Sequence, residues 1–156
     1  MIPSTRRVLF SALLLLAGCA TTAQRQVQVT AQTIQQATAA MKACVQAVQN
    51  KPEYASLLPH TPDFATGQFT MAQLTDENQP TSDDARLLAA KHDELIPCRN
   101  QFITAISKVR PDAVPIMTAW WISNDQVLVR LIERKMTWAE AFREQQAVAV
   151  QAKKSS

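Results

Sequence analysis

Glycine is scarce in this chain: only Gly18 and Gly67 occur among 156 residues. Sheets need glycine at many of their tight turns, so this scarcity disfavours an all-β fold. Alanine, the best helix former, and glutamine are abundant instead. We therefore predict an all-α fold: an antiparallel helical hairpin closed by C-terminal helices, forming a single small helical-bundle domain.

Histidine is also scarce, with two residues in the whole chain. His60, His92 and Cys98 could supply metal ligands, but zinc sites normally show pairs at short, regular spacing, and these residues do not. His92 fits the flank of a helix. We predict no metal site and no cofactor.

A nucleophile paired with a base is missing as well. Cys44 and Cys98 are better used in a disulfide than as a thiolate nucleophile. The acidic pairs Asp83-Asp84 and Asp93-Glu94 suit a helix start and a solvated face rather than an acid–base pair, and no partner residue stands out. We predict that the protein is not an enzyme and has no catalytic residues.

Excess charge of either sign is absent. The formal net charge is +3, and no basic stripe with interleaved aromatic residues appears, so we predict no nucleic-acid partner. Arg6 and Arg7 lie in the N-terminal segment. If that segment is removed, 14 basic residues face 13 acidic ones and the net charge falls to +1.

The longest apolar run, residues 8–16, has about nine residues and is too short to cross a bilayer of about 30 Å. It follows Arg6 and Arg7, and small residues come after it, which is the order of a secretory signal. Because Leu16-Ala17-Gly18-Cys19 ends the run, this signal resembles the lipobox of bacterial lipoproteins. The resemblance implies that Cys19 is acylated and becomes the first residue of the mature protein.

The export route stays open, because Arg6-Arg7 also resembles a twin-arginine signal, although two ordinary positive residues explain it as well. An aspartate after the acylated cysteine retains enteric lipoproteins in the inner membrane. Here that residue is Ala20, which points to the outer membrane. We therefore predict a lipid-anchored protein of the cell envelope that faces the periplasm.

Four parts of the chain follow from this reading. Residues 1–18 are the signal peptide, 19–22 the acylated N-terminus with a short tether, 23–151 the helical domain, and 152–156 a disordered tail.

Helical periodicity divides the domain further. Spacing of apolar residues predicts a first long helix from about 23 to 50, followed by a proline-rich connector over 51–82 that packs across the helices. A short helix over 71–77 begins at a capping box, Thr70 to Gln73. A last helix with little core beyond Phe142 runs from Trp138 to about Gln151.

Two further helical regions are predicted after the connector, and each contains a possible interruption. Pro97 lies inside the second long helix, 82–110, and either kinks or breaks it; a kink is favoured because the apolar spacing continues through it. Asp112 can cap a third helix. Ser123-Asn124-Asp125 looks like a break followed by a new cap.

Three patches together resemble an uncharacterised family of small helical envelope proteins from proteobacteria. They lie around Cys44 and Pro52-Glu53-Tyr54-Ala55, around His92 and Pro97-Cys98-Arg99, and over 135–141. The resemblance covers most of residues 40–143. It implies one periplasmic helical domain and supplies no activity.

Trp120 and Trp121 are a candidate interaction surface. Neighbouring residues on a helix point about 100° apart, so both rings cannot enter one core. We expect one ring to be buried and the other to be accessible. The alternative is that the connector covers the second ring.

Cys44 and Cys98 are predicted to form a disulfide. Once Cys19 is acylated, two cysteines remain, and export takes them to an oxidising compartment. Each lies on the apolar flank of its own long helix, so the pairing requires the region of Pro97 to lie beside Cys44. Two reduced, buried thiols are the alternative.

These features together predict a membrane-anchored periplasmic lipoprotein of structural or adaptor type that engages another envelope protein through a helical face. Its partners would be the bilayer, through acylated Cys19, and an unidentified envelope protein. The alternative function is a periplasmic binding module for a small apolar ligand near Trp120 and Trp121. The two differ in what they need: a ligand module needs an apolar pocket of a few hundred Å³, and an adaptor needs an exposed apolar patch.

Overall fold

The computed structural model describes the backbone of residues 5–62 and 68–154 and the side chains of residues 22–62 and 68–152. Its helical segments are α1 Thr5–Gln49, the 3₁₀ helix η1 Pro52–His60, α2 Met71–Leu74, α3 Ser82–Ile106, α4 Ala113–Ile132 and α5 Trp138–Lys154. No strand occurs in these ranges. The predicted all-α fold is confirmed.

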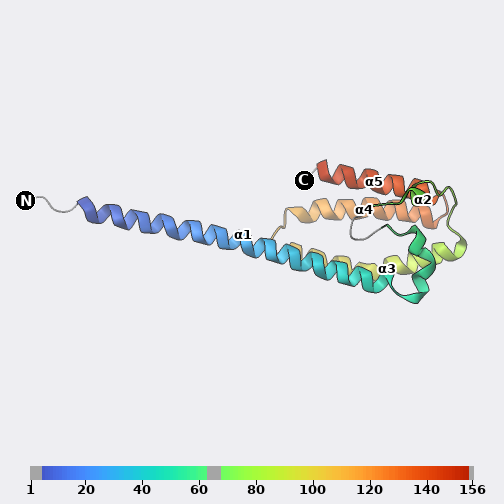
Figure 1. Ribbon diagram of the computed structural model, residues 1–156, viewed down its shortest axis with the longest axis horizontal. Helices are drawn as coiled ribbons and strands as arrows, with labels where there is room; N and C mark the ends of the chain where they lie inside the picture. The colour runs from blue at the N-terminus through green and yellow to red at the C-terminus, as the bar shows by residue number, and fades with distance from the viewer. Residues whose placement is uncertain (1–4, 63–67, 155–156) are drawn as a thin grey trace, which may run out of the picture.

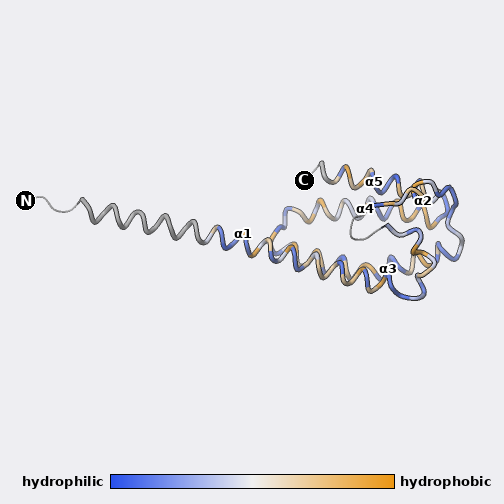
Figure 2. Tube along the Cα trace, viewed as in Figure 1, coloured by the Kyte–Doolittle hydropathy of each residue, from blue (hydrophilic) through white to orange (hydrophobic). Residues whose placement is uncertain are grey.

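The four long helices lie side by side in chain order, each antiparallel to the one before it (Figure 1). α1 and α3 form the hairpin, α4 packs on α3, and α5 packs on α4. The N-terminal part of α1 runs out beyond the other helices. Hydrophobic and hydrophilic positions recur in turn along each described helix, as amphipathic helices require (Figure 2).

The main core lies where the connector crosses the helices. Tyr54 and Leu57 of η1 are 2% and 1% exposed, and they meet the first turns of α5 and the second half of α4. The expectation that the connector packs across the helices is therefore confirmed. The buried members of this core are Val48, Tyr54, Leu57, Val127, Leu131, Met136, Trp138, Ala141 and Phe142.

The start of α5 contributes more core than its sequence suggested. Trp138 and Phe142 are both nearly fully buried, and the ring of Phe142 lies 4.7 Å from that of Phe69. The expectation of little core besides Phe142 was wrong. The predicted helix start is confirmed: the Thr137 hydroxyl accepts from the Glu140 N–H at 3.2 Å, and the Glu140 carboxylate accepts from the Thr137 N–H at 2.7 Å.

α3 continues through Pro97 without a break. This agrees with the expectation that one helix, rather than two, spans this proline. Proline removes one N–H from the helix ladder, so the carbonyl of Asp93 loses its partner. Both Pro97 and Asp93 are exposed, and water can therefore satisfy that carbonyl.

The break expected at residues 123–125 does not occur, because α4 runs through them. Ser123 and Asn124 donate to the carbonyls of Ala119 and Trp120, four residues earlier, at 3.0 and 2.8 Å. Residues that often cap helices instead bond back along the same helix here. Asp112 does stand at the start of α4, but its carboxylate pairs with Arg110 and forms no cap.

Several helix boundaries differ from expectation, and α3 ends at Ile106 rather than at 110. α1 begins at Thr5, well before residue 23, and ends at Gln49, one residue from the expected end. α2 ends at Leu74, not at 77. α5 continues to Lys154, so residues 152–154 are helical where a disordered tail was expected, and residues 155–156 lie outside the described residues.

Candidate functional site

A cleft of about 410 Å³ lies between the first half of α4 and the last turns of α5. None of the described residues that line it is charged. Its lining includes Ile116, Ala119, Trp120 and Ser123 from α4, and Val148 and Ala152 from α5.

Helical spacing explains why Trp120 lines this cleft. Trp120 precedes Val127 by seven residues and Leu131 by eleven, so all three share one face of α4. Val127 and Leu131 are 2% and 3% exposed, because the connector and α5 cover them. Trp120 is 36% exposed, since it lies where that cover ends. The cleft is therefore a continuation of the core face that the chain itself does not fill.

An ion pair joins the two helices beside the cleft. The Arg130 guanidinium donates to both carboxylate oxygens of Glu144. Glu144 stands one turn before Val148, and Arg130 stands two turns after Ser123. The pair thus holds α4 and α5 together at the inner end, where the apolar cleft gives way to the core.

Trp121 faces a different neighbour. Its ring contacts Phe102 of α3 edge-on, with centroids 6.2 Å apart, and the Arg99 guanidinium lies 5.8 Å from its centroid. Trp121 is half-buried between α3 and α4, whereas Trp120 is exposed in the cleft. The two rings thus have different surroundings, although their centroids lie 6.3 Å apart and neither ring is fully buried as one was expected to be.

Other hollows are weaker candidates. One, lined by Ile122, Val129 and neighbouring polar residues, lies on the outer side of α4 alone, so a single helix provides all its walls. Another, of about 220 Å³, lies in the seam of the hairpin and is lined largely by Ala37, Ala40, Phe102 and Ala105. Of these three hollows, the α4–α5 cleft is the one in which two helices frame an exposed tryptophan ring.

Cys44 and Cys98 lie at disulfide distance, with Cα atoms 5.8 Å apart, and the predicted pairing is confirmed. Cys98 is 1% exposed. The pairing also confirms the register that was expected, in which the region of Pro97 lies beside Cys44. Cys19 is part of α1, but its side chain lies outside the described residues, and its acylation stays a prediction.

The two histidines take part in separate contacts between elements. His92 Nε2 lies 3.2 Å from Asp125 Oδ1, and the same carboxylate accepts two hydrogen bonds from Arg99, at 2.7 and 2.8 Å. This cluster fastens α3 to α4. Because Arg99 already pairs with Asp125, that carboxylate is a poor metal ligand, and no group of three or more possible metal ligands gathers among the described residues.

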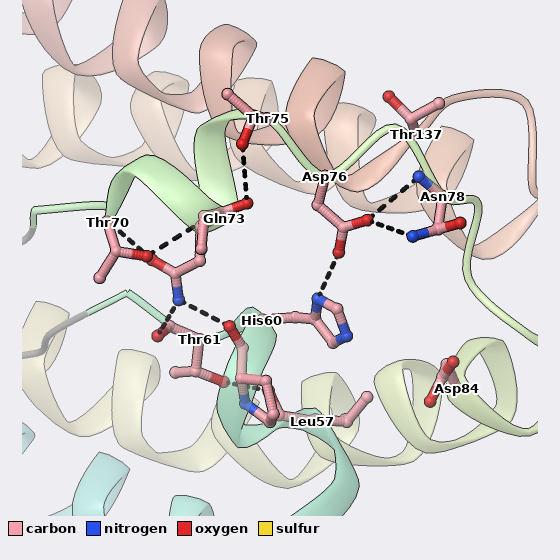
Figure 3. A network of polar contacts seen from close by, with 12 residues as sticks. Leu57, His60, Thr61, Thr70, Gln73, Thr75, Asp76, Asn78, Asp84 and Thr137 are labelled. Atoms are coloured by element: carbon pink, nitrogen blue, oxygen red, sulfur yellow. Dashed lines mark hydrogen bonds and ion pairs between the residues drawn. The ribbon is translucent and has the colours of Figure 1, made fainter.

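His60 belongs to the network that closes the connector (Figure 3). Its Nδ1 lies 3.3 Å from Asp76 Oδ2, and its ring stacks on Trp138 with centroids 4.1 Å apart. Gln73, which is buried, donates to the carbonyls of Pro59 and Thr61 at 2.8 and 2.9 Å. These contacts tie η1 to the α2–α5 corner, so the network has an evident structural role.

The pKa values of three titrating groups around the connector are shifted by their surroundings. Burial lowers the pKa of Lys91, whose Nζ lies 3.4 Å from the Thr61 hydroxyl. A hydrogen bond from Lys51, with Nζ 2.7 Å from the carboxylate, lowers the pKa of Glu94, and the Tyr54 hydroxyl donates to the same carboxylate. Burial, together with that hydrogen bond, raises the pKa of Tyr54.

Sequence reasoning found Trp120 but missed the other wall of the cleft. Val148 and Ala152 lie in a stretch of α5 that looked frayed, and their spacing of four was the only available signal. Comparison with protein-family models, curated proteins and solved structures finds no match for this chain. The predicted resemblance to a family of envelope proteins therefore stays a prediction. Within the described ranges, no helix combines the length and the apolar character needed to cross a membrane.

Proposed function

We propose that this chain is a lipid-anchored protein of the cell envelope that acts by docking another envelope protein in the α4–α5 cleft, without catalysing a reaction. The observation that carries the docking is the cleft itself. It presents Trp120 and Ile116, 36% and 38% exposed, on a face whose continuation is core. Exposed apolar surface next to well-packed core is typical of interaction sites, and tryptophan is enriched in their energetic centres.

The anchor is supported by the Leu16-Ala17-Gly18-Cys19 box and by the short apolar run before it. A protein carrying two or more acyl chains stays at the membrane, because each buried CH₂ contributes about 0.8 kcal/mol. The partner would then be a protein that meets it at the membrane surface.

A site-specific photocrosslinker tests the docking in cells. It is placed at Ile116, on the rim of the cleft, or at Ile122, which is also an exposed isoleucine of α4 but lies outside the cleft. We expect a protein adduct from the Ile116 position, no such adduct from Ile122, and loss of the adduct when Trp120→Ser is added. Equal adducts from the two positions would contradict a docking role for the cleft.

The second candidate is binding of a small apolar ligand. The volume of about 410 Å³ favours it, because ligand pockets span about 300–1,000 Å³. In that case the Ile116 crosslinker gives no protein adduct. Instead, solvent extraction of purified protein recovers an apolar compound, and Trp120→Ser abolishes its recovery.

A further inference from the structure

The part of α1 nearest the anchor stands apart from the bundle. We call residues 22–32 the stalk. Every residue from Thr22 to Val29 is exposed, including Val27 at 68%, and among the side chains of α1 that the structure describes, the first buried one is Ala37. The backbone of this segment runs out beyond the other helices (Figure 1). The core therefore takes nothing from the stalk.

The stalk contains good helix formers, alanine and glutamine, but little besides its own backbone hydrogen bonds supports its helix. The first acidic residue of the chain is Glu53, so no ion pair between residues four apart can support this stretch. Val27, Val29 and Thr30 are β-branched, which lowers helix propensity further. A helix of fewer than about 12–15 residues is marginal in water without packing. Because no core contact holds the stalk, we expect it to open more readily than the packed helices once the predicted signal is removed.

The stalk contains a single basic residue, Arg25. Arg25 is the only lysine or arginine between Cys19 and Lys42. Arg25 lies in a hydrogen-bonded helix, but that part of the helix packs on no core residue. The basic residues in the turns between long helices belong to the packed bundle, where Arg110 N–H donates to Ile106 and Lys135 N–H donates to Arg130. The long connector stretch 52–85 contains no lysine or arginine.

We propose that the Arg25–Gln26 peptide bond is a release site for an endopeptidase that recognises arginine. Water adds across the bond, leaving a carboxylate on Arg25 and an amine on Gln26. The acylated peptide 19–25 stays at the membrane. Residues 26–156 leave as a folded unit that retains the Cys44–Cys98 link and the whole core. Release from a membrane rests on the proposed acylation of Cys19, and it does not depend on what the cleft binds.

Limited proteolysis of the full lipidated protein tests this proposal. The protein is reconstituted in phosphatidylethanolamine–phosphatidylglycerol vesicles and treated with trypsin under non-reducing conditions. Vesicles are sedimented at intervals, and the supernatant is analysed by intact mass and thermal unfolding. We expect the first product to begin at Gln26 and to melt at the temperature of the uncut protein.

Matched variants locate the cut. Arg25→Gln should slow the appearance of soluble domain about tenfold or more, because cleavage must then use sites that open less often. Lys42→Gln, an exposed residue of α1 that lies two positions before the disulfide, should leave the rate unchanged. Trimming after Lys153 or Lys154 leaves the N-terminus of the product unchanged and is recognised by its mass. A first cut between residues 27 and 151, an unaffected Arg25→Gln variant, or a product without a cooperative transition would overturn the proposal.

Failure of the anchor would look different. The protein would then be in the supernatant before trypsin is added, while mass analysis would still report whether the first cut follows Arg25.

Discussion

Adjacent tryptophans show how one step along a helix changes the role of a side chain. Trp121 packs against Phe102 and under Arg99, whereas Trp120 is exposed in the cleft. Burial of aromatic area, not the identity of the ring, sets the contribution to stability.

Alanine substitution should separate the two rings. We expect Trp121→Ala to lower the free energy of unfolding by about 2–3 kcal/mol, below the full core value of 3–5 because the ring is only half-buried. Trp120→Ala should cost less than about 1 kcal/mol. Urea unfolding of both variants measures the difference. Equal, large losses would mean that both rings are merely packed and that the cleft is not an open surface.

Glu94 is the residue at which pH should act most directly. Its pKa is lowered by the hydrogen bond from Lys51, so its folded carboxylate binds protons less readily than the unfolded one. The stabilisation is present above the unfolded pKa and is lost as pH falls through the folded pKa.

Glu94→Gln should therefore be less stable than wild type at pH 7 and equally stable at low pH, where both side chains are neutral. Thermal unfolding from pH 7 down to 2.5 checks this. Lys51→Met, which removes the partner and keeps Glu94, should show the same convergence. A stability difference for Glu94→Gln that stays constant with pH would refute the role given to this ion pair.

At the scale of elements, a covalent link joins the two helices of the hairpin, α1 and α3. Its seam closes around Cys44 and Cys98, far apart in sequence and 5.8 Å apart at Cα. The connector crosses the end of this hairpin and fills the core between η1, α4 and α5.

Removing the disulfide should destabilise the whole domain, because the covalent loop limits the unfolded chain. In the chain-entropy model, the loop closed over a sequence separation of 54 residues contributes up to about 4 kcal/mol. We expect a Cys44→Ser, Cys98→Ser double variant to lose stability by up to that amount in urea unfolding, and reduced wild type to match it. Two titratable thiols in denatured protein from the native envelope would show that the bond does not form there.

The start of α5 offers a second test at this scale. Thr137→Ala removes the hydroxyl that accepts from Glu140 N–H, and it should cost about 1 kcal/mol. Thr137→Ser keeps the acceptor and should restore most of that loss. Thermal unfolding distinguishes the two, and equal melting temperatures for all three proteins would mean that the cap contributes nothing.

At the scale of the whole molecule, the arrangement is a row of antiparallel helices with its core at one end and its cleft toward the other (Figure 1). The end of the bundle from which the stalk emerges is also the end nearer the cleft. On the proposed anchoring, the docking site therefore lies on the membrane side of the main core.

Anchoring itself has a direct test. Cys19→Ser should abolish incorporation of a clickable palmitate analogue, because the acylated thiol is gone, and the precursor should accumulate or be cut by another peptidase. A Cys44→Ser, Cys98→Ser variant, which keeps Cys19, should label as wild type does. Equal labelling of wild type and Cys19→Ser would remove the basis for the proposed location.

The sequence alone determined the features that depend on local chemistry or on the number of residues of one type. Scarce glycine and helical periodicity specified an all-α chain. The capping box at Thr137 specified where α5 begins. With Cys19 assigned to the proposed anchor, the two cysteines that remain specified the Cys44–Cys98 link. These inferences succeeded because each depends on neighbours in sequence or on a single distant partner.

Only the tertiary structure decided which surfaces are covered. Ser123 and Asn124 carry the same local signals whether a helix stops or continues, and bonding back to Ala119 and Trp120 within a packed helix settled the choice. Likewise, the sequence placed Trp120 and Trp121 on different faces but could not say which face α3 covers. That assignment depends on where the connector, α3 and α5 end in space, because burial is a property of the neighbours that a side chain meets.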